Sequence, residues 1–434
     1  MFWKLFKKKT IPIESTASSH QSSTQTDNQL TLSLLQKLIP IGELAPQDLL
    51  ALPCLFRRFA AGEIIFNRGE RAEELMYLYS GEIFLETANG SGVSIEASLF
   101  RACYPLSSQN EHHFTAIAKS AATIIYFPLS VMQRSADIME HHNPLTDIKL
   151  TPIRLQNSQL FKSFCEAYNQ ERLQIPSLPD VAIRLRSALQ KNIDIGNAVK
   201  IINLDPAIAA KLVQVANSNL YRINQPFASC HDAVNRLGLQ TTQNLVTSMS
   251  LKNLFRSDNR LLNTCIQRIW KQSIQIASLS YILATLSRKQ NADEALLAGL
   301  VHNIGALPII AHAESLDSET YTEQELMETI TTLQSQVGEY ILSKWHFPAN
   351  LLKIPKQTSY WYHDAQPSLQ LSDIVLLARF HSQLGTPQAQ ALPPINTLPA
   401  FSKLGEYSLT PDMSLQILQD AKQQIAEALN FFRG

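Results

Sequence analysis

The sequence lacks a charge excess, closely spaced cysteines and long apolar runs, features that would each indicate a particular class of protein. Basic and acidic residues number 37 each, and charged residues make up only 17%, so charge gives no general case for binding nucleic acid or an acidic membrane. No two of the five cysteines lie closer than 35 residues, which excludes CxxC pairs and zinc-finger spacings and predicts a reduced, cytoplasmic protein. No apolar run reaches the roughly 18 residues expected of a membrane helix. The remaining composition, 45% hydrophobic over 434 residues, predicts two or three globular domains.

The first 28 residues differ in texture from the rest. The basic and aromatic start MFWKLFKKKT lacks the apolar stretch of a signal peptide and runs into the polar segment SSHQSSTQTDNQ. We predict that residues 1–28 are disordered and solubilising. The alternative is a weak membrane-surface contact in which Phe2, Trp3 and Phe6 insert into the lipid.

A β-rich domain is predicted over residues 29–145. Short helices come first, and then RRFAAGEIIFNRGE, LMYLYSGEIFLET and ATIIYFP read as short strands broken by glycine turns. LSVMQRSADIMEHH has a helical pattern and predicts a helix at the end of this domain. AAGEIIFNRGE and LMYLYSGEIFLE resemble the cyclic-nucleotide-binding domain, whose fold is a β jelly roll. The resemblance places Gly62, Gly69 and Gly81 at turns of that fold.

The ligand-binding part departs from that family. Its nucleotide-binding members carry a Gly-Glu helix and then an arginine that pairs with the cyclic phosphate. Here the corresponding stretch is YPLSSQNEHHFTAIAKSA, with Phe114 about where the arginine would stand. We therefore expect a structural or partner-docking barrel without a bound cofactor. The pair His112-His113 could coordinate a metal, but solvated loop histidines are the simpler interpretation.

From about Cys165 onward the apolar pattern has a period of 3.6 residues and predicts helices. Asp205-Pro206 marks a helix start, because a capping carboxylate precedes a proline at the first helical position. AVNRLGLQTTQNLVTSM has the outline of a DNA-reading helix-turn-helix. Its second helix, QTTQNLVTSM, has no lysine or arginine for phosphates, so we favour ordinary packing of two helices and expect no nucleic-acid partner.

The segments IPSLPDVAIRLRSAL, IINLDPAIAAKLVQVANSNLY and HDAVNRLGLQTTQNLVTSMSLKNLF together resemble an HDOD domain. IWKQSIQIASLSYILA, LAGLVHNIGALPII and GEYILSKWHFP continue the resemblance in order, over residues 165–385. HDOD domains are all-helical relatives of HD phosphohydrolases, and most are regarded as signalling or regulatory modules. The fold class expected is therefore a multi-domain chain, a β jelly roll followed by an all-α domain.

The resemblance also allows the metal site of HD phosphohydrolases to be checked position by position. Those enzymes hold divalent ions with histidine and aspartate ligands. The corresponding positions in this chain carry, in order, Gln272, His302, Asn303, Gln334 and His363, with Arg379 near the last aspartate. Amides are poor replacements for these ligands. We predict a vestigial pocket, in which Gln272, Asn303 and Gln334 form a neutral network, without metal and without catalysis.

The remaining segments are a linker over residues 146–164 and a Pro-rich loop with a final amphipathic helix over residues 386–434. That helix packs on the chain or builds a homodimer. The function expected is regulation through protein partners whose identity the sequence does not give. Two alternatives stay open: a nucleotide-sensing switch for a cyclic nucleotide or cyclic di-GMP, and a residual metal-dependent phosphohydrolase.

Overall fold

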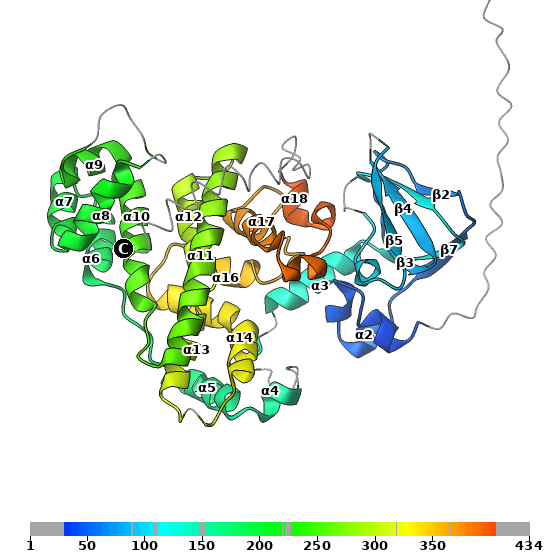
Figure 1. Cartoon of the computed structure of the whole chain (residues 1–434), viewed down its shortest axis with the longest axis horizontal. Helices are drawn as coiled ribbons and strands as arrows, with labels where there is room; N and C mark the ends of the chain where they lie inside the picture. Colours follow the sequence, from blue (N-terminus) through cyan, green and yellow to red (C-terminus); the bar gives the residue numbers. More distant parts are fainter. Residues whose placement is uncertain are drawn as a thin grey trace, which may run out of the picture.

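The computed structural model describes residues 30–404 apart from 88–89, 108–110, 142, 147–150, 152, 219–220, 222–226, 318 and 365. The predictions for residues 1–28 and for the C-terminal helix lie outside these residues. Figure 1 shows a β domain at one end of the molecule, with helix α3 between it and the helical part. All five cysteines are free thiols.

The β domain consists of two antiparallel sheets, as the jelly-roll expectation requires. One sheet has the order β1-β7-β3 and the other β2-β6-β4-β5. The strands are β1 (Leu55–Phe59), β2 (Ile64–Phe66), β3 (Glu74–Ser80), β4 (Glu82–Glu86), β5 (Gly92–Glu96), β6 (Thr115–Ala118) and β7 (Ala122–Pro128). The sequence patterns predicted all of these except β5 and β6. Gly81 turns β3 into β4 with φ +90°, and a Cβ there would collide with the backbone of Ala121.

Strand β7 is buried on both of its faces. Ile124 and Tyr126 point into the core between the two sheets, whereas Ile125 and Phe127 belong to the larger core that continues into the helices. Successive side chains of a strand point to opposite sides, so this strand joins two hydrophobic cores. Tyr77 on β3 is also part of the larger core, and its hydroxyl donates to the carbonyl of Ile39 at 2.9 Å.

Short helices flank the β domain. They are α1 (Leu32–Leu35), the 3₁₀ turn η1 (Ile41–Glu43), α2 (Pro46–Leu50), the 3₁₀ turn η2 (Phe100–Cys103) and α3 (Ser130–His141). Helix α3 also contacts the helical part, since Ser135 Oγ lies 3.0 Å from the hydroxyl of Tyr360. The residues predicted as a linker include α4 (Ile153–Asn157) and the start of α5 (Gln159–Asn169).

The helical part begins with a layer of shorter helices. They are α6 (Asp180–Leu189), α7 (Ile195–Ile202), α8 (Pro206–Ala216), α9 (Cys230–Leu237) and α10 (Leu239–Leu251). Asp205 caps α8 as predicted, because its carboxylate accepts from the backbone N–H of Ile208 at 3.1 Å. Gly238 separates α9 from α10 with φ +78°. Residues 244–251 of α10 are all buried, which agrees with helix packing rather than with DNA reading.

The long helices come next, and they form the centre of the molecule in Figure 1. They are α11 (Arg260–Ser287), α12 (Ala292–Val301), α13 (Ala306–Glu314) and α14 (Glu323–Lys344). Pro308 lies inside the first turn of α13, where its missing N–H costs no helical bond. Residues Ala292–Glu314 have the length and apolar composition of a membrane span. However, 89% of their most apolar 18-residue stretch is buried inside the protein.

The chain then packs smaller elements around these helices. They are α15 (Ala349–Leu352), α16 (Ile354–Gln357), α17 (Leu371–Gln383), η5 (Pro387–Ala391), η6 (Ile395–Thr397) and α18 (Pro399–Ser402). The Pro-rich segment predicted as a loop therefore forms 3₁₀ turns and a short helix. It returns to the β domain, where the hydroxyl of Tyr104 donates to the carbonyl of Ala391 at 2.7 Å.

Candidate functional site

The position that corresponds to an HD metal site lies where α12 ends. His302 directly follows α12, and its Nδ1–H donates to the carbonyl of Gly299 at 2.7 Å. Asn303 is buried, and its amide oxygen accepts a hydrogen bond of 2.7 Å from Ser273 of α11. The pair is therefore held by neighbouring protein groups, with the amide oxygen of Asn303 already engaged.

Glycines bring the backbones close together around this pair. A Cβ on Gly299 would collide with the backbone of Ala277 in α11. A Cβ on Gly305 would collide with the carbonyl of Gln334 and the N–H of Gly338, both in α14. The residues around the His-Asn pair thus pack closely on α11 and α14. This close approach requires glycine at positions 299 and 305.

Arg379 of α17 supplies a positive charge at this position. Burial and then the nearby Arg379 guanidinium lower the pKa of His302 to about 3, so the imidazole is neutral at physiological pH. Burial also lowers the pKa of Arg379 to about 10, and its Nη1 has neither solvent contact nor a hydrogen-bond partner. The guanidinium carbon lies 5.0 Å from the ring centroid of Trp361, a cation–π contact that holds the side chain in place.

These groups do not fit a divalent metal ion. A dication needs several anionic or imidazole donors, whereas this position offers one imidazole, an amide oxygen bonded to Ser273 and a guanidinium. In the part of the chain that the structure describes, no three His, Cys, Asp or Glu side chains are grouped so that they could hold a metal. The charge near the HD pair is therefore a cation of the protein itself, Arg379.

The structure brings together only some of the residues predicted to form the vestigial pocket. Gln272 is exposed, and its neighbour Ser273 makes the contact to Asn303 instead. Gln334 is half-buried and approaches the pair through its backbone. His363 is buried but lines a different cavity. The neutral network of three amides is thus replaced by a Ser-Asn bond, which the residue types alone did not indicate.

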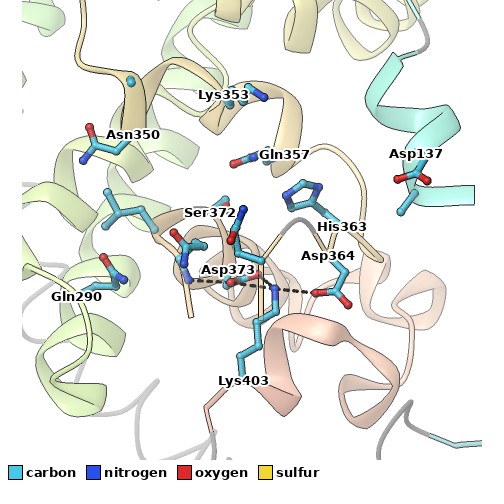
Figure 2. Close-up of a pocket in the computed structure, with 15 residues that line it drawn as sticks. Asp137, Gln290, Asn350, Lys353, Gln357, His363, Asp364, Ser372, Asp373 and Lys403 are labelled. Carbon is cyan, nitrogen blue, oxygen red and sulfur yellow. Dashed lines mark hydrogen bonds and ion pairs between the residues drawn. The ribbon is translucent and has the colours of Figure 1, made fainter. Parts of the chain in front are cut away.

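A second site is a polar cavity of about 490 Å³ between α3 and the helical part. Figure 2 shows Asp137 of α3 on one side, and Asn350, Lys353 and Gln357 on another. Its remaining polar lining is Gln290, His363, Asp364, Gln366, Gln370, Ser372, Asp373 and Lys403. No motif of the sequence pointed to it, because its residues are contributed by segments from 136 to 403.

A buried ion cluster forms one wall of this cavity. Lys403 Nζ lies 3.0 Å from Asp364 and 3.2 Å from Asp373, and the dashed lines of Figure 2 mark these pairs. Asp373 is 1% exposed and also accepts from the backbone N–H of Gln370 at 2.8 Å. Burial raises the pKa of Asp373 even though Lys403 acts in the opposite direction.

The barrel loop that corresponds to the nucleotide-binding part contacts the C-terminal segment. The ring of His113 lies edge-on to that of Phe401 at 6.0 Å, close to the bond between Tyr104 and Ala391. Phe114 packs half-buried against the barrel core. His112 is buried and stacks on Phe66 at 4.0 Å, so the prediction of two solvated histidines was wrong for His112.

Comparison with known proteins identifies part of the chain. Residues 175–359 match the model of the HDOD domain. A solved structure named "Putative metal-dependent phosphohydrolase" from Shewanella amazonensis SB2B is 26% identical, with a TM-score of 0.54, and the match covers 62% of this chain and 98% of that one. The matched part of this chain is therefore similar in fold to that protein.

Two further matches are weaker. An uncharacterized protein of Treponema pallidum (strain Nichols) is 25% identical over 213 residues, which are 45% of this chain but only 39% of that protein. A cyclic nucleotide-binding-like protein from Brucella abortus is 19% identical with a TM-score of 0.21, and the match covers 24% of this chain and 97% of that one. The chain thus spans less than half of the curated relative that it matches.

Proposed function

Because residues 175–359 form an HDOD domain, we propose that the chain is a non-catalytic signal-transduction protein of the bacterial cytoplasm that acts by binding other proteins. The comparisons support a regulatory or HD-related role. The observation that carries the non-catalytic part is the Arg379 guanidinium beside a neutral His302.

Metal-dependent phosphate hydrolysis needs a dication that activates water and offsets the phosphate charge. At the HD pair of this chain, a dication would meet the positive charge of Arg379 without a carboxylate to offset either charge. Like charges in a poorly hydrated site repel strongly, so metal affinity falls. Arg379 could attract a phosphate, but it cannot activate water as a metal does.

The catalytic alternative is tested with the full chain, Mn²⁺ or Mg²⁺ and substrates such as cyclic di-GMP and a nucleoside phosphodiester. We expect no turnover, and no stoichiometric zinc, manganese or iron in the purified protein by elemental analysis. Turnover that His302→Ala abolishes, while the exposed variant His231→Ala retains it, would show that the protein is a phosphohydrolase.

The interaction part is tested by affinity capture from the native host. Leu204, between α7 and α8, is 64% exposed, the largest exposed fraction among the large hydrophobic side chains described as exposed. We expect a specific host protein to be retained by wild type and lost with Leu204→Ser. The matched variant Leu286→Ser, at a residue 48% exposed on α11, should retain it. Equal retention by both variants would exclude the α7–α8 face, and no specific capture would contradict the interaction proposal.

The nucleotide-sensing alternative is tested by calorimetric titration of the full chain with cyclic AMP, cyclic GMP and cyclic di-GMP. The contacts of Tyr104 and His113 with the C-terminal segment support a barrel loop that serves domain docking. We expect no heat of binding from any of the three. Saturable binding that weakens in Arg101→Met, the half-buried arginine near this loop, would favour a sensor instead.

A further inference from the structure

The cavity between α3 and the helical part carries an inference that does not depend on the HD pair. Its volume of about 490 Å³ lies in the usual range of small-molecule sites, roughly 300–1,000 Å³. Asp137, Asp364, Asp373 and Lys403 all lie outside the matched residues 175–359. The cavity is therefore built largely by segments that flank the HDOD domain, and it touches the β domain through α3.

The charges of the cavity favour a positive ligand. Three carboxylates line it, those of Asp137, Asp364 and Asp373, against the two ammonium groups of Lys353 and Lys403. Lys403 is shared between Asp364 and Asp373, at 3.0 and 3.2 Å, so this cluster keeps one negative charge in excess while both carboxylates are ionised. Asp364 is 30% exposed, which leaves its carboxylate accessible from the cavity.

The carboxamides add hydrogen-bond acceptors. The amide nitrogen of Gln290 donates to the carbonyl of Leu369 at 2.7 Å, and that of Gln370 donates to the carbonyl of Ser368 at 2.9 Å. The amide nitrogen of Asn350 donates to the carboxylate of Glu294 at 3.1 Å. A carbonyl or carboxylate can only accept, so these bonds fix which end of each amide faces its partner. The oxygen of Gln370 accepts the backbone N–H of Asp373 at the start of α17, so the amide oxygens of Gln290 and Asn350 are the ones left to offer to a ligand.

A ligand that satisfies these walls must bring positive charge and several N–H or O–H donors. We propose that this cavity binds a small aliphatic molecule that carries a primary ammonium group, with Asp364 as its principal anionic contact and the amide oxygens as further acceptors. A phosphate or nucleotide would instead meet uncompensated acceptors and excess negative charge. Since the cavity is lined by both α3 and the helical part, the bound molecule would also stabilise their contact.

The experiment titrates the full chain with two amines and their neutral counterparts. Putrescine is compared with 1,4-butanediol, and glucosamine with glucose, which separates a linear amine from an amino sugar. We expect at least one amine to bind saturably with a Kd below about 1 mM and to raise the Tm, while its neutral counterpart does neither. Equal binding of the neutral counterpart, or no saturable binding by either amine, would overturn the proposal.

Variants locate the binding. Asp364→Asn should weaken the amine at least tenfold, while Asp258→Asn, which removes one exposed carboxylate from the loop before α11, should leave its Kd unchanged. Gln357→Leu tests the same cavity without touching the ion cluster, and it should also weaken binding because it replaces a polar wall group by one of similar size. Unchanged affinity in both Asp364→Asn and Gln357→Leu would place the amine elsewhere and refute the site.

Discussion

The two ends of α12 accommodate buried charge in opposite ways. At the C-terminal end, by the HD pair, Arg379 has an Nη1 without a partner, and burial together with this nearby cation keeps His302 neutral. Near the N-terminal end, roughly 15 Å away along the helix, Gln290 belongs to a cavity in which Lys403 is paired with two carboxylates. One end thus holds a buried guanidinium with an unpartnered nitrogen, whereas at the other end a buried lysine is paired with two carboxylates. The polar cavity therefore does not lie at the position that the HD resemblance indicates.

The largest expected effect comes from breaking the ion cluster. Lys403→Met removes the cation that pairs with Asp373, which is 1% exposed, and leaves a buried carboxylate without its partner. We expect the free energy of unfolding at pH 7 to fall by about 3–5 kcal/mol, measured by urea denaturation. The matched exposed variant Lys191→Met should change it by less than about 0.5 kcal/mol. A loss below about 1 kcal/mol in Lys403→Met would show that the cluster is not stabilising.

The pH dependence of that variant follows from the raised pKa of Asp373. A carboxyl with a higher pKa in the folded state binds protons more readily when folded, so its contribution to stability improves as the pH falls. Removing Lys403 takes away an interaction that lowers this pKa, so the shift grows. The deficit of Lys403→Met should therefore shrink between pH 7 and pH 5. A deficit that is constant over this range would assign the loss to packing rather than to charge.

The next effect concerns the close packing beside the HD pair. Gly305→Ala places a methyl group against the backbone of Gln334 and Gly338 and must push α14 away. We expect a loss of about 1–3 kcal/mol in the free energy of unfolding. Gly196→Ala is the control, because its Cβ would meet only the Asp194 side chain, at 3.4 Å. Equal stability of the two variants would contradict the close packing of Gly305 against α14.

The smallest effect is expected at Arg379 itself. Arg379→Met removes a buried donor without a partner together with a cation–π contact, so we expect the free energy of unfolding to change by no more than about 1 kcal/mol. The pKa of His302 should rise above about 3 but stay below 6.5, because burial remains the larger cause. An NMR titration of the imidazole measures this, with the exposed variant Arg256→Met as the control. An unchanged His302 pKa would refute the electrostatic contact between the two residues.

The two ends should also differ in the sign of their pH dependence. A histidine whose folded pKa is below its unfolded value binds fewer protons when folded, so His302 costs stability as the pH falls from about 6.5 toward 3. Asp373 acts in the opposite direction. In Arg379→Met the loss of stability on acidification should be smaller than in wild type, measured by urea denaturation between pH 5 and pH 3, where the pH approaches the folded-state pKa of His302. Identical slopes in this range would show that Arg379 does not lower the pKa of His302.

The resemblance gave the positions of the His302-Asn303 pair and of Arg379, and the structure places the charge of Arg379 near His302. The sequence did not predict Ser273, since consecutive residues of a helix point about 100° apart and the pattern cannot decide which of Gln272 and Ser273 faces Asn303. It also missed β5, in which only Ile95 is buried. The sequence could not predict the cavity for a different reason. Its lining residues, from Asp137 to Lys403, come together only through tertiary packing.

Strand β7, with one face in each core, has a consequence for how this chain can be divided. A fragment that ended soon after α3 would cut through the larger core, to which Tyr77, Ile125 and Phe127 belong together with residues of the helical part, and would expose apolar surface at the cut. A fragment that began after α3 would lose Ser135 and the aromatic contacts that the β domain provides. The β domain and the helical part therefore share one core. We expect them to unfold together in a single calorimetric transition.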